Sequence, residues 1–295
     1  MIERIAIIGA GQMGAGIAHV CALSELRIIL TDVDHVRLQH GIKTINENLD
    51  RQIGRGKISV SEKENALARI QTTVALNSLA DVDLVIEAVS EKEEVKCDIF
   101  KELAKVLNKN ALIATNTSSI SITRLAASSD RPGQFMGMHF MNPVPIMKLV
   151  EIIRGYNTSD KVTKSIMELS ENLKKVPVEA NDYPGFVANR ILMPMINEAI
   201  ETFYNNVAGV KEIDTVMKLG MAHPMGPLQL ADFIGLDVCH SILEVMYDGF
   251  KNPKYAPCPL LTNMVMAGKL GIKSGEGFYD YSESKKAEKV SSQFS

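Results

Sequence analysis

The sequence predicts a doubly wound α/β fold with a mostly parallel sheet, followed by an all-helical C-terminal domain. Three observations predict it. Short apolar runs alternate with helical patterns through the first half of the chain, which is typical of parallel strands joined by helices. A glycine-rich motif directly follows the first apolar run. After the turn-rich segment 181–185, the strand pattern nearly disappears, and helices are expected at 186–205, 210–219, 228–247 and 260–266.

The glycine-rich motif lies between the apolar run 4–8 and the first helical pattern, in the spacing G-x-G-x-x-G. The first glycine is expected to form a tight turn, the second to let a pyrophosphate approach the backbone, and the third to let the helix pack on the strand. The phosphates would then lie at the positive N-terminus of the helix. The context predicts a Rossmann-type dinucleotide site that includes Gly9, Gly11, Gln12, Met13 and Gly14.

The second apolar run, 27–31, ends at Asp32. A carboxylate at this distance from the glycine motif is expected to accept hydrogen bonds from the adenosine ribose hydroxyls. It would also repel a 2′-phosphate, so Asp32 favours NAD over NADP. The alternative, a turn residue at the end of a strand, explains the acid but not its spacing from the glycines.

Further buried strands are expected at 83–89, 111–116, 134–139 and 147–153, with helical stretches between the earlier ones. In a doubly wound sheet, ligands lie beyond the carboxyl ends of the strands. Besides the glycine motif and Asp32, the polar side chains expected there are Glu91, Asn116, Ser118 and His139. We therefore expect these residues to line one crevice, with Glu91 and Asn116 near the dinucleotide.

His139 and Glu151 lie on either side of a segment that contains Pro143 and Pro145. Glu151 stands inside the apolar run 149–153, where an unpaired charge would be costly. The prolines keep the segment from forming a helix or a ladder, so a turn could bring Glu151 back to His139. A buried carboxylate that holds an imidazole is typical of a general base. A core histidine with an unrelated strand-end glutamate fits the local pattern equally well.

The chain has 295 residues, which is enough for two domains. We expect an NAD-binding domain at 1–182, a helical domain for substrate binding and dimerisation at 183–281, and a flexible polar tail at 282–295. The stretch 186–205 is apolar around most of its helical circumference. That pattern favours burial on more than one side, through a homodimer or a higher homo-oligomer.

Composition excludes several classes of protein. The net charge of −3 provides no basic field, so nucleic acid is not an expected partner. No apolar run is long enough to predict a membrane span. The 4 cysteines are scattered without the spacing of metal ligands, which predicts reduced thiols, no metal site and a cytoplasmic location.

Several further segments carry a family pattern. They are Asn-Thr-Ser-Ser at 116–119, His-Phe-Met-Asn-Pro-Val-Pro at 139–145, Lys-Leu-Val-Glu at 148–151, Pro-Gly-Phe-Val-Ala-Asn-Arg at 184–190, His-Pro-Met-Gly-Pro at 223–227 and Lys-Ser-Gly-Glu-Gly-Phe-Tyr at 273–279. Together with the glycine motif, they make the chain resemble the L-3-hydroxyacyl-CoA dehydrogenases, in particular the short monofunctional bacterial 3-hydroxybutyryl-CoA dehydrogenases. The resemblance extends from Ile2 to Tyr281.

The resemblance implies roles for individual residues. It makes His139 the catalytic base and Glu151 its orienting partner. It places Ser118 and Asn189 at the reacting end of the substrate. The positions around the nicotinamide half of the cofactor correspond to Glu91, Lys96, Asn142 and Lys273.

The same resemblance gives Lys57 a contact to coenzyme A. One position departs from the family pattern, because Asp50 stands where the family often has a serine near coenzyme A. An acid beside an anionic ligand is expected to weaken binding, so the coenzyme A end of the site has less support than the NAD end.

The expected activity is NAD-dependent interconversion of a short (S)-3-hydroxyacyl-CoA and its 3-ketoacyl-CoA. A dehydrogenase of a free sugar acid, of the gulonate type, is the nearest alternative, and the run 144–149 favours the acyl-CoA branch. A non-catalytic NAD-binding redox sensor is a second alternative. Retention of His139, Ser118 and Glu151 is evidence against it.

Overall fold

Residues 2–295 are described by a computed structural model that divides into two compact units. The units comprise Met1–Tyr183 and Pro184–Ser295, and each has its own core of buried apolar side chains. The predicted α/β class is confirmed, because the first unit is built on one mostly parallel sheet and the second is mainly helical.

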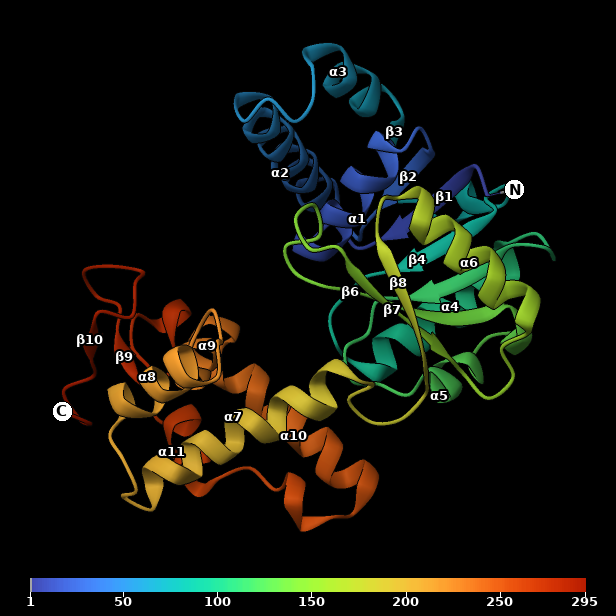
Figure 1. Ribbon diagram of the computed structural model, residues 1–295. Helices are drawn as coiled ribbons and strands as arrows, with labels where there is room; N and C mark the ends of the chain where they lie inside the picture. Colours follow the sequence, from blue (N-terminus) through green and yellow to red (C-terminus); the bar gives the residue numbers. More distant parts are fainter. Residues whose placement is uncertain (1) are drawn as a thin grey trace. The chain divides into compact units, whose positions relative to one another are not determined.

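An eight-stranded sheet forms the centre of the first unit (Figure 1). Its order is β3-β2-β1-β4-β5-β6-β7-β8, and all neighbouring strands are parallel except β6 and β7. The central strand β4 is buried along its whole length, which explains its continuous apolar run. The strands are β1 Arg4–Ile8, β2 Arg27–Thr31, β3 Ile70–Thr73, β4 Leu84–Glu87, β5 Leu112–Thr115, β6 Phe135–Phe140, β7 Leu149–Arg154 and β8 Val176–Asn181.

The order of the strands reverses between β1 and β4. From β1 the chain proceeds outward through β2 and β3, then crosses to β4 on the other side of β1. A crevice opens at the carboxyl ends of the strands at such a switch point. The glycine motif directly follows β1 and Glu91 closely follows β4, so both segments flank this crevice.

Four of the α-helices of the first unit begin at a capping side chain, whereas α1 and α4 begin without one. The Asp34 side chain accepts a hydrogen bond from the Arg37 backbone, and Ser59 forms a capping box with Glu62. Helix α3 and strand β3 have no counterpart in the prediction. Only Ala66 of α3 is buried, and β3 is short and only partly buried, so neither has a clear apolar pattern. The helical elements are α1 Gln12–Leu23, α2 His35–Gly54, α3 Val60–Ala68, η1 Leu76–Leu79, α4 Glu93–Val106, α5 Ile122–Ala126, η2 Pro132–Gln134 and α6 Asp160–Asn172.

The second unit differs from the prediction at one helix. The expected helix 228–247 is interrupted at Gly235, whose φ of 104° lies in a region that favours glycine. Two helices therefore replace one. The helical elements are α7 Ala188–Tyr204, α8 Val210–Gly220, α9 Pro227–Ile234, α10 Leu236–Phe250, η3 Pro253–Tyr255, α11 Pro259–Met266 and η4 Ile272–Ser274.

The segment after Tyr281 is not the loose tail that its polar composition predicts. Strand β10, Lys289–Val290, pairs with β9, Tyr279–Asp280, so the second unit also contains a small antiparallel sheet. The Phe294 ring stacks on Phe278 with 5.7 Å between centroids. These apolar contacts fix the segment, and the polar residues around them concealed this in the sequence.

Candidate active site

The loop after β1 has the geometry of a dinucleotide cradle. Gly9 has a φ of +102°, and a Cβ placed on it would lie 2.6 Å from the Ala88 carbonyl oxygen. A Cβ on Gly14 would lie 1.7 Å from the Gly9 carbonyl oxygen. Among the described residues, a Cβ on Gly11 would meet no atom within 4 Å. The loop therefore packs closely on the protein side and stays open at Gly11, where a pyrophosphate needs room.

Asp32 lies at the end of β2 with its carboxylate fixed beside this loop. Its Oδ2 accepts a hydrogen bond from the Ala10 backbone N–H at 2.7 Å, and its Oδ1 accepts one from Val33 N–H at 2.7 Å. The Arg37 guanidinium lies 4.0 Å from Asp32 and 3.5 Å from Asp34. Two carboxylates thus engage the nearest arginine, which leaves the pocket suited to a neutral ribose rather than a 2′-phosphate.

His139 and Glu151 face each other across the antiparallel pair β6–β7. The Nδ1 atom of His139 lies 2.7 Å from Oε2 of Glu151, and both side chains are buried. An ionised Glu151 favours the tautomer that carries hydrogen on Nδ1, so Nε2 is the nitrogen that can accept a proton. This is the arrangement that a general base requires.

Two asparagines connect the segments around the crevice. Asn116 accepts a hydrogen bond from the Phe140 backbone N–H at 2.9 Å and so ties the end of β5 to β6. The Gln12 amide donates to Asn142 Oδ1 at 3.1 Å, which joins the glycine loop to the β6–β7 connection. Met13, by contrast, packs against the apolar core.

Lys96 is in an unexpected environment. Its side chain is fully buried, and its Nζ lies 2.7 Å from Glu87 Oε1 and 3.3 Å from Glu91 Oε2. Two carboxylates thus surround its ammonium group, and the role beside the cofactor that the resemblance implies for Lys96 stays a prediction. Glu87 is absent from the predicted site, although an acid within an apolar run, here 84–89, is the same signal that marks Glu151.

The region expected to bind coenzyme A lies at the end of α2. Lys57 is exposed in the connection between α2 and α3. Asp50 is also exposed, and its Oδ1 lies 2.5 Å from Lys63 Nζ on α3. The acid that the sequence suggests would oppose an anionic ligand is therefore paired with a lysine, and its effect on coenzyme A binding stays a prediction.

The remaining predicted residues belong to the second unit. Asn189 is buried in the first turn of α7. Lys273 lies in η4 and forms an ion pair with Asp237 in the first turn of α10. Their roles at the reacting end of the substrate and at the nicotinamide stay predictions.

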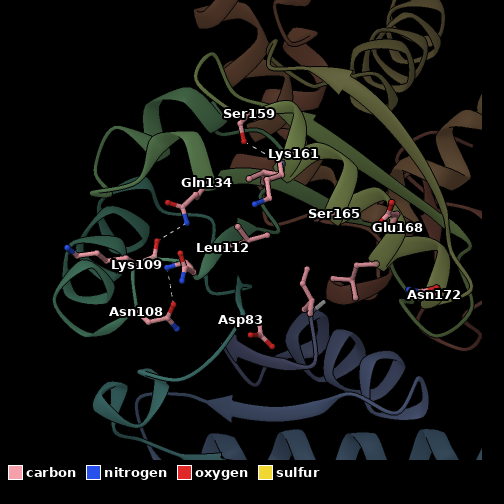
Figure 2. Close-up of a pocket in the computed structure, with 14 residues that line it drawn as sticks. Asp83, Asn108, Lys109, Leu112, Gln134, Ser159, Lys161, Ser165, Glu168 and Asn172 are labelled. Carbon is pink, nitrogen blue, oxygen red and sulfur yellow. Dashed lines mark hydrogen bonds between the residues drawn. The ribbon is translucent and has the colours of Figure 1, made fainter.

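A hollow of about 600 Å³ lies near the amino ends of β4, β5 and β6, at the opposite ends of these strands from the glycine loop (Figure 2). Part of its polar lining is hydrogen-bonded to the protein's own backbone. The Asn108 amide donates to the carbonyls of Ala80 and Val82, and Gln134 donates to Lys109. Ligands of this fold bind at the carboxyl ends, so this hollow is not the predicted site.

Two features are absent from residues 2–295. No group of three or more His, Cys, Asp or Glu side chains in this range could hold a metal ion. Within the same range, no helix combines the length and apolarity that crossing a membrane requires.

Both units match one protein family. Residues 4–183 match the part described as "3-hydroxyacyl-CoA dehydrogenase, NAD binding domain", and residues 185–281 match "3-hydroxyacyl-CoA dehydrogenase, C-terminal domain". The first match confirms NAD as the predicted cofactor.

Individual relatives are similar over nearly the whole chain. A 3-hydroxybutyryl-CoA dehydrogenase of Bradyrhizobium diazoefficiens is 54% identical over 95% of this chain and 96% of its own. A probable 3-hydroxybutyryl-CoA dehydrogenase of Deinococcus radiodurans is 52% identical over 94% of this chain and 100% of its own. The crystal structure of (S)-3-hydroxybutyryl-CoA dehydrogenase PaaH1 from Ralstonia eutropha superimposes with a TM-score of 0.94 at 47% identity, covering 96% of this chain and 100% of that one.

Proposed function

Since this chain belongs to the 3-hydroxyacyl-CoA dehydrogenase family, we propose that it interconverts (S)-3-hydroxyacyl-CoA and 3-ketoacyl-CoA with NAD as cofactor. The relatives named as 3-hydroxybutyryl-CoA dehydrogenases support a short acyl chain, with 3-hydroxybutyryl-CoA and acetoacetyl-CoA as the substrate pair. The observation that carries the proposal is the buried His139–Glu151 pair at the carboxyl edge of a sheet that also presents the glycine cradle.

In the oxidative direction, His139 accepts the proton of the 3-hydroxyl group on Nε2 while hydride leaves C3. Bound NAD supplies the hydride acceptor. Glu151 stabilises the imidazolium through the 2.7 Å contact at Nδ1 and keeps the ring oriented. In the reductive direction, the same imidazolium returns its proton to the 3-oxygen. A positioned base of this kind typically contributes about 10²–10⁴-fold to the rate.

Other side chains would position the substrate. The Ser118 hydroxyl would donate a hydrogen bond to the reacting oxygen, and Asn189 would contact the same end of the substrate. Lys57 would contact the coenzyme A phosphates as an exposed cation on the α2–α3 connection. Each role can be tested by replacing the side chain and measuring kcat and KM separately.

The decisive assay is NADH oxidation with acetoacetyl-CoA, longer 3-ketoacyl-CoAs and an oxidised sugar acid, each repeated with NADPH. The proposal expects the highest kcat/KM with acetoacetyl-CoA and NADH. Turnover of the sugar acid in preference to every thioester would contradict it. NADH binding without turnover of any substrate would instead favour the redox-sensor alternative.

A homodimer or a higher homo-oligomer in a reducing compartment completes the proposal. Large apolar side chains on the helical unit are exposed, including Ile191 at 68%, Leu219 at 83% and Met266 at 81%. Such surface favours association. All 4 cysteines are free thiols, which supports a cytoplasmic location. Light scattering coupled to gel filtration measures the mass, and a monomer at micromolar concentration would contradict the dimer.

A further inference from the structure

The charged side chain of Lys96 is held away from solvent. It is 0% exposed, as is the side chain of Glu87. The ammonium group lies 2.7 and 3.0 Å from the two carboxylate oxygens of Glu87 and 3.3 Å from Oε2 of Glu91. Glu91 is the one member of the three that reaches the surface, with a side chain 38% exposed. Glu91 therefore connects the buried Lys96 to the loop after β5.

Glu87 is fixed by the ends of two strands. Its Oε1 accepts a hydrogen bond from the Val89 backbone N–H at 2.6 Å, and its Oε2 accepts one from the Thr115 hydroxyl at 2.6 Å. Glu87 ends β4 and Thr115 ends β5, so the carboxylate is anchored to the sheet itself. The sheet thus determines where the Lys96 ammonium lies.

Glu91 in turn holds the loop that follows β5. Its Oε1 accepts hydrogen bonds from the Thr117 hydroxyl at 2.5 Å, from Ser118 N–H at 2.8 Å and from Ser119 N–H at 3.2 Å. The Ser119 hydroxyl lies 3.3 Å from the same oxygen, so one oxygen accepts from four donors of the loop while the other faces Lys96. An ionised carboxylate is the acceptor that such a cluster of donors requires.

The charges make the arrangement interdependent. Lys96 separates two carboxylates that would otherwise repel each other inside the protein. If its charge is removed, Glu91 loses the cation that orients it, and the Ser118 loop loses its anchor. If Glu87 is neutralised, the lysine is left with a single, partly exposed partner. In both cases the consequence appears at Ser118, although both side chains are fully buried.

We propose that Glu87 and Lys96 are positioning residues, whose buried ion pair holds Glu91 in the orientation that fixes the Ser118 loop. This inference rests on the proposed function, in which the Ser118 hydroxyl contacts the reacting 3-oxygen. The loop then sets the distance between these two oxygen atoms. A small displacement at a reacting centre can reduce the rate by about 10²-fold.

A double-mutant cycle separates positioning from simple stabilisation. The variants are Glu87→Gln, Lys96→Met and the two combined. Lys96→Met leaves the buried Glu87 carboxylate without a cation, and Glu87→Gln leaves Lys96 with only the partly exposed Glu91, so both are expected to lower Tm. The double variant leaves no fully buried charge unpaired, since only the partly exposed Glu91 loses its cation, and is expected to regain most of that loss. Its kcat with acetoacetyl-CoA and NADH is nevertheless expected to stay about 10- to 100-fold below wild type, because nothing orients Glu91.

A second readout does not depend on activity. The backbone amides of Ser118 and Ser119 donate to Glu91, so their hydrogen exchange reports directly on the loop. We expect both amides to exchange faster in Lys96→Met and in the double variant, even where Tm has recovered. The matched control is Glu102→Gln combined with Lys105→Met, an exposed ion pair on the same helix α4. It should leave Tm, kcat and exchange near wild type.

The outcomes are distinguishable. Recovery of Tm, kcat and amide protection together in the double variant would show that the pair only fills the interior, and would overturn the inference. Wild-type protein that fails to reduce any 3-ketoacyl-CoA would refute the proposed function, while the exchange measurement would still decide whether Lys96 fixes the loop.

Discussion

Oε2 of Glu151 lies 2.7 Å from Nδ1 of His139, and the two residues are directly opposite in the antiparallel register of β6 and β7. Directly opposite residues in such a pair have neighbouring side chains, so the contact is determined by the register rather than by a flexible loop. Both side chains are buried, which strengthens their interaction and limits the positions the imidazole can adopt.

The first prediction concerns Glu151→Gln. The amide cannot stabilise an imidazolium, and it permits either tautomer of His139, so we expect kcat to fall by about 10²-fold or more. The pH dependence of kcat should change as well. Steady-state kinetics from pH 5 to 10 would measure both. Glu179→Gln on the neighbouring strand β8 is the control, because Glu179 is exposed. A wild-type kcat and pH profile in Glu151→Gln would mean that the carboxylate does not assist the histidine.

The second prediction concerns His139→Gln. Removal of the base is expected to lower kcat by about 10²–10⁴-fold. NADH binding should stay close to wild type, since the glycine cradle and Asp32 are unchanged. Fluorescence titration with NADH and stopped-flow reduction of acetoacetyl-CoA measure the two quantities separately. An unchanged kcat would rule out the proposed mechanism.

Much of the first unit could be predicted, because its strands are continuous apolar runs and its glycine motif has a fixed spacing. Elements with little buried surface were harder to predict. Strand β3 is a partly buried edge strand, β10 depends on pairing with β9, and the segment that follows β10 depends on the contact of Phe294 with Phe278. Gly235 interrupts a helical pattern that reads as continuous, since a single glycine within a helix is also tolerated.

In the candidate site, too, some residues could be predicted from the sequence and others could not. A charge within an apolar run correctly indicated a partner for Glu151. The same signal marks Glu87, but an acid at the end of a strand is equally typical of a turn. Burial of Lys96 depends on residues from other segments, as does the pairing of Asp50 with Lys63 on a separate helix. Sequence spacing identifies such residues without revealing which of them touch.

The third prediction concerns cofactor choice. Asp32→Ser removes the carboxylate that would repel a 2′-phosphate and releases Arg37, which lies 4.0 Å away. We expect the ratio of kcat/KM for NADPH over NADH to rise about tenfold or more, the effect of one hydrogen bond to a charged group. Asp34→Asn is the control, because the asparagine keeps the cap of α2. A ratio unchanged in Asp32→Ser would show that Asp32 does not select the cofactor.

The fourth prediction concerns acid stability and His19. This residue is buried on α1, and burial lowers its pKa from 6.5 to about 4. The Gln52 side chain slightly favours the charged form, but neither ring nitrogen makes a hydrogen bond of acceptable geometry. Protonation therefore favours the unfolded chain. The contribution of His19 to the free energy of unfolding is constant above pH 6.5, decreases as the pH falls from 6.5 to 4, and levels off below pH 4.

The full effect of this shift is about 3 kcal/mol in the free energy of unfolding. Urea denaturation at a series of pH values measures it. We expect His19→Gln to show a flatter loss of stability between pH 6.5 and 4 than wild type, because the unfolded chain then gains no proton at this position. His35→Gln, which removes an exposed histidine, should retain the wild-type slope. Equal slopes in His19→Gln and wild type would mean that His19 is protonated as readily in the folded protein as in the unfolded chain.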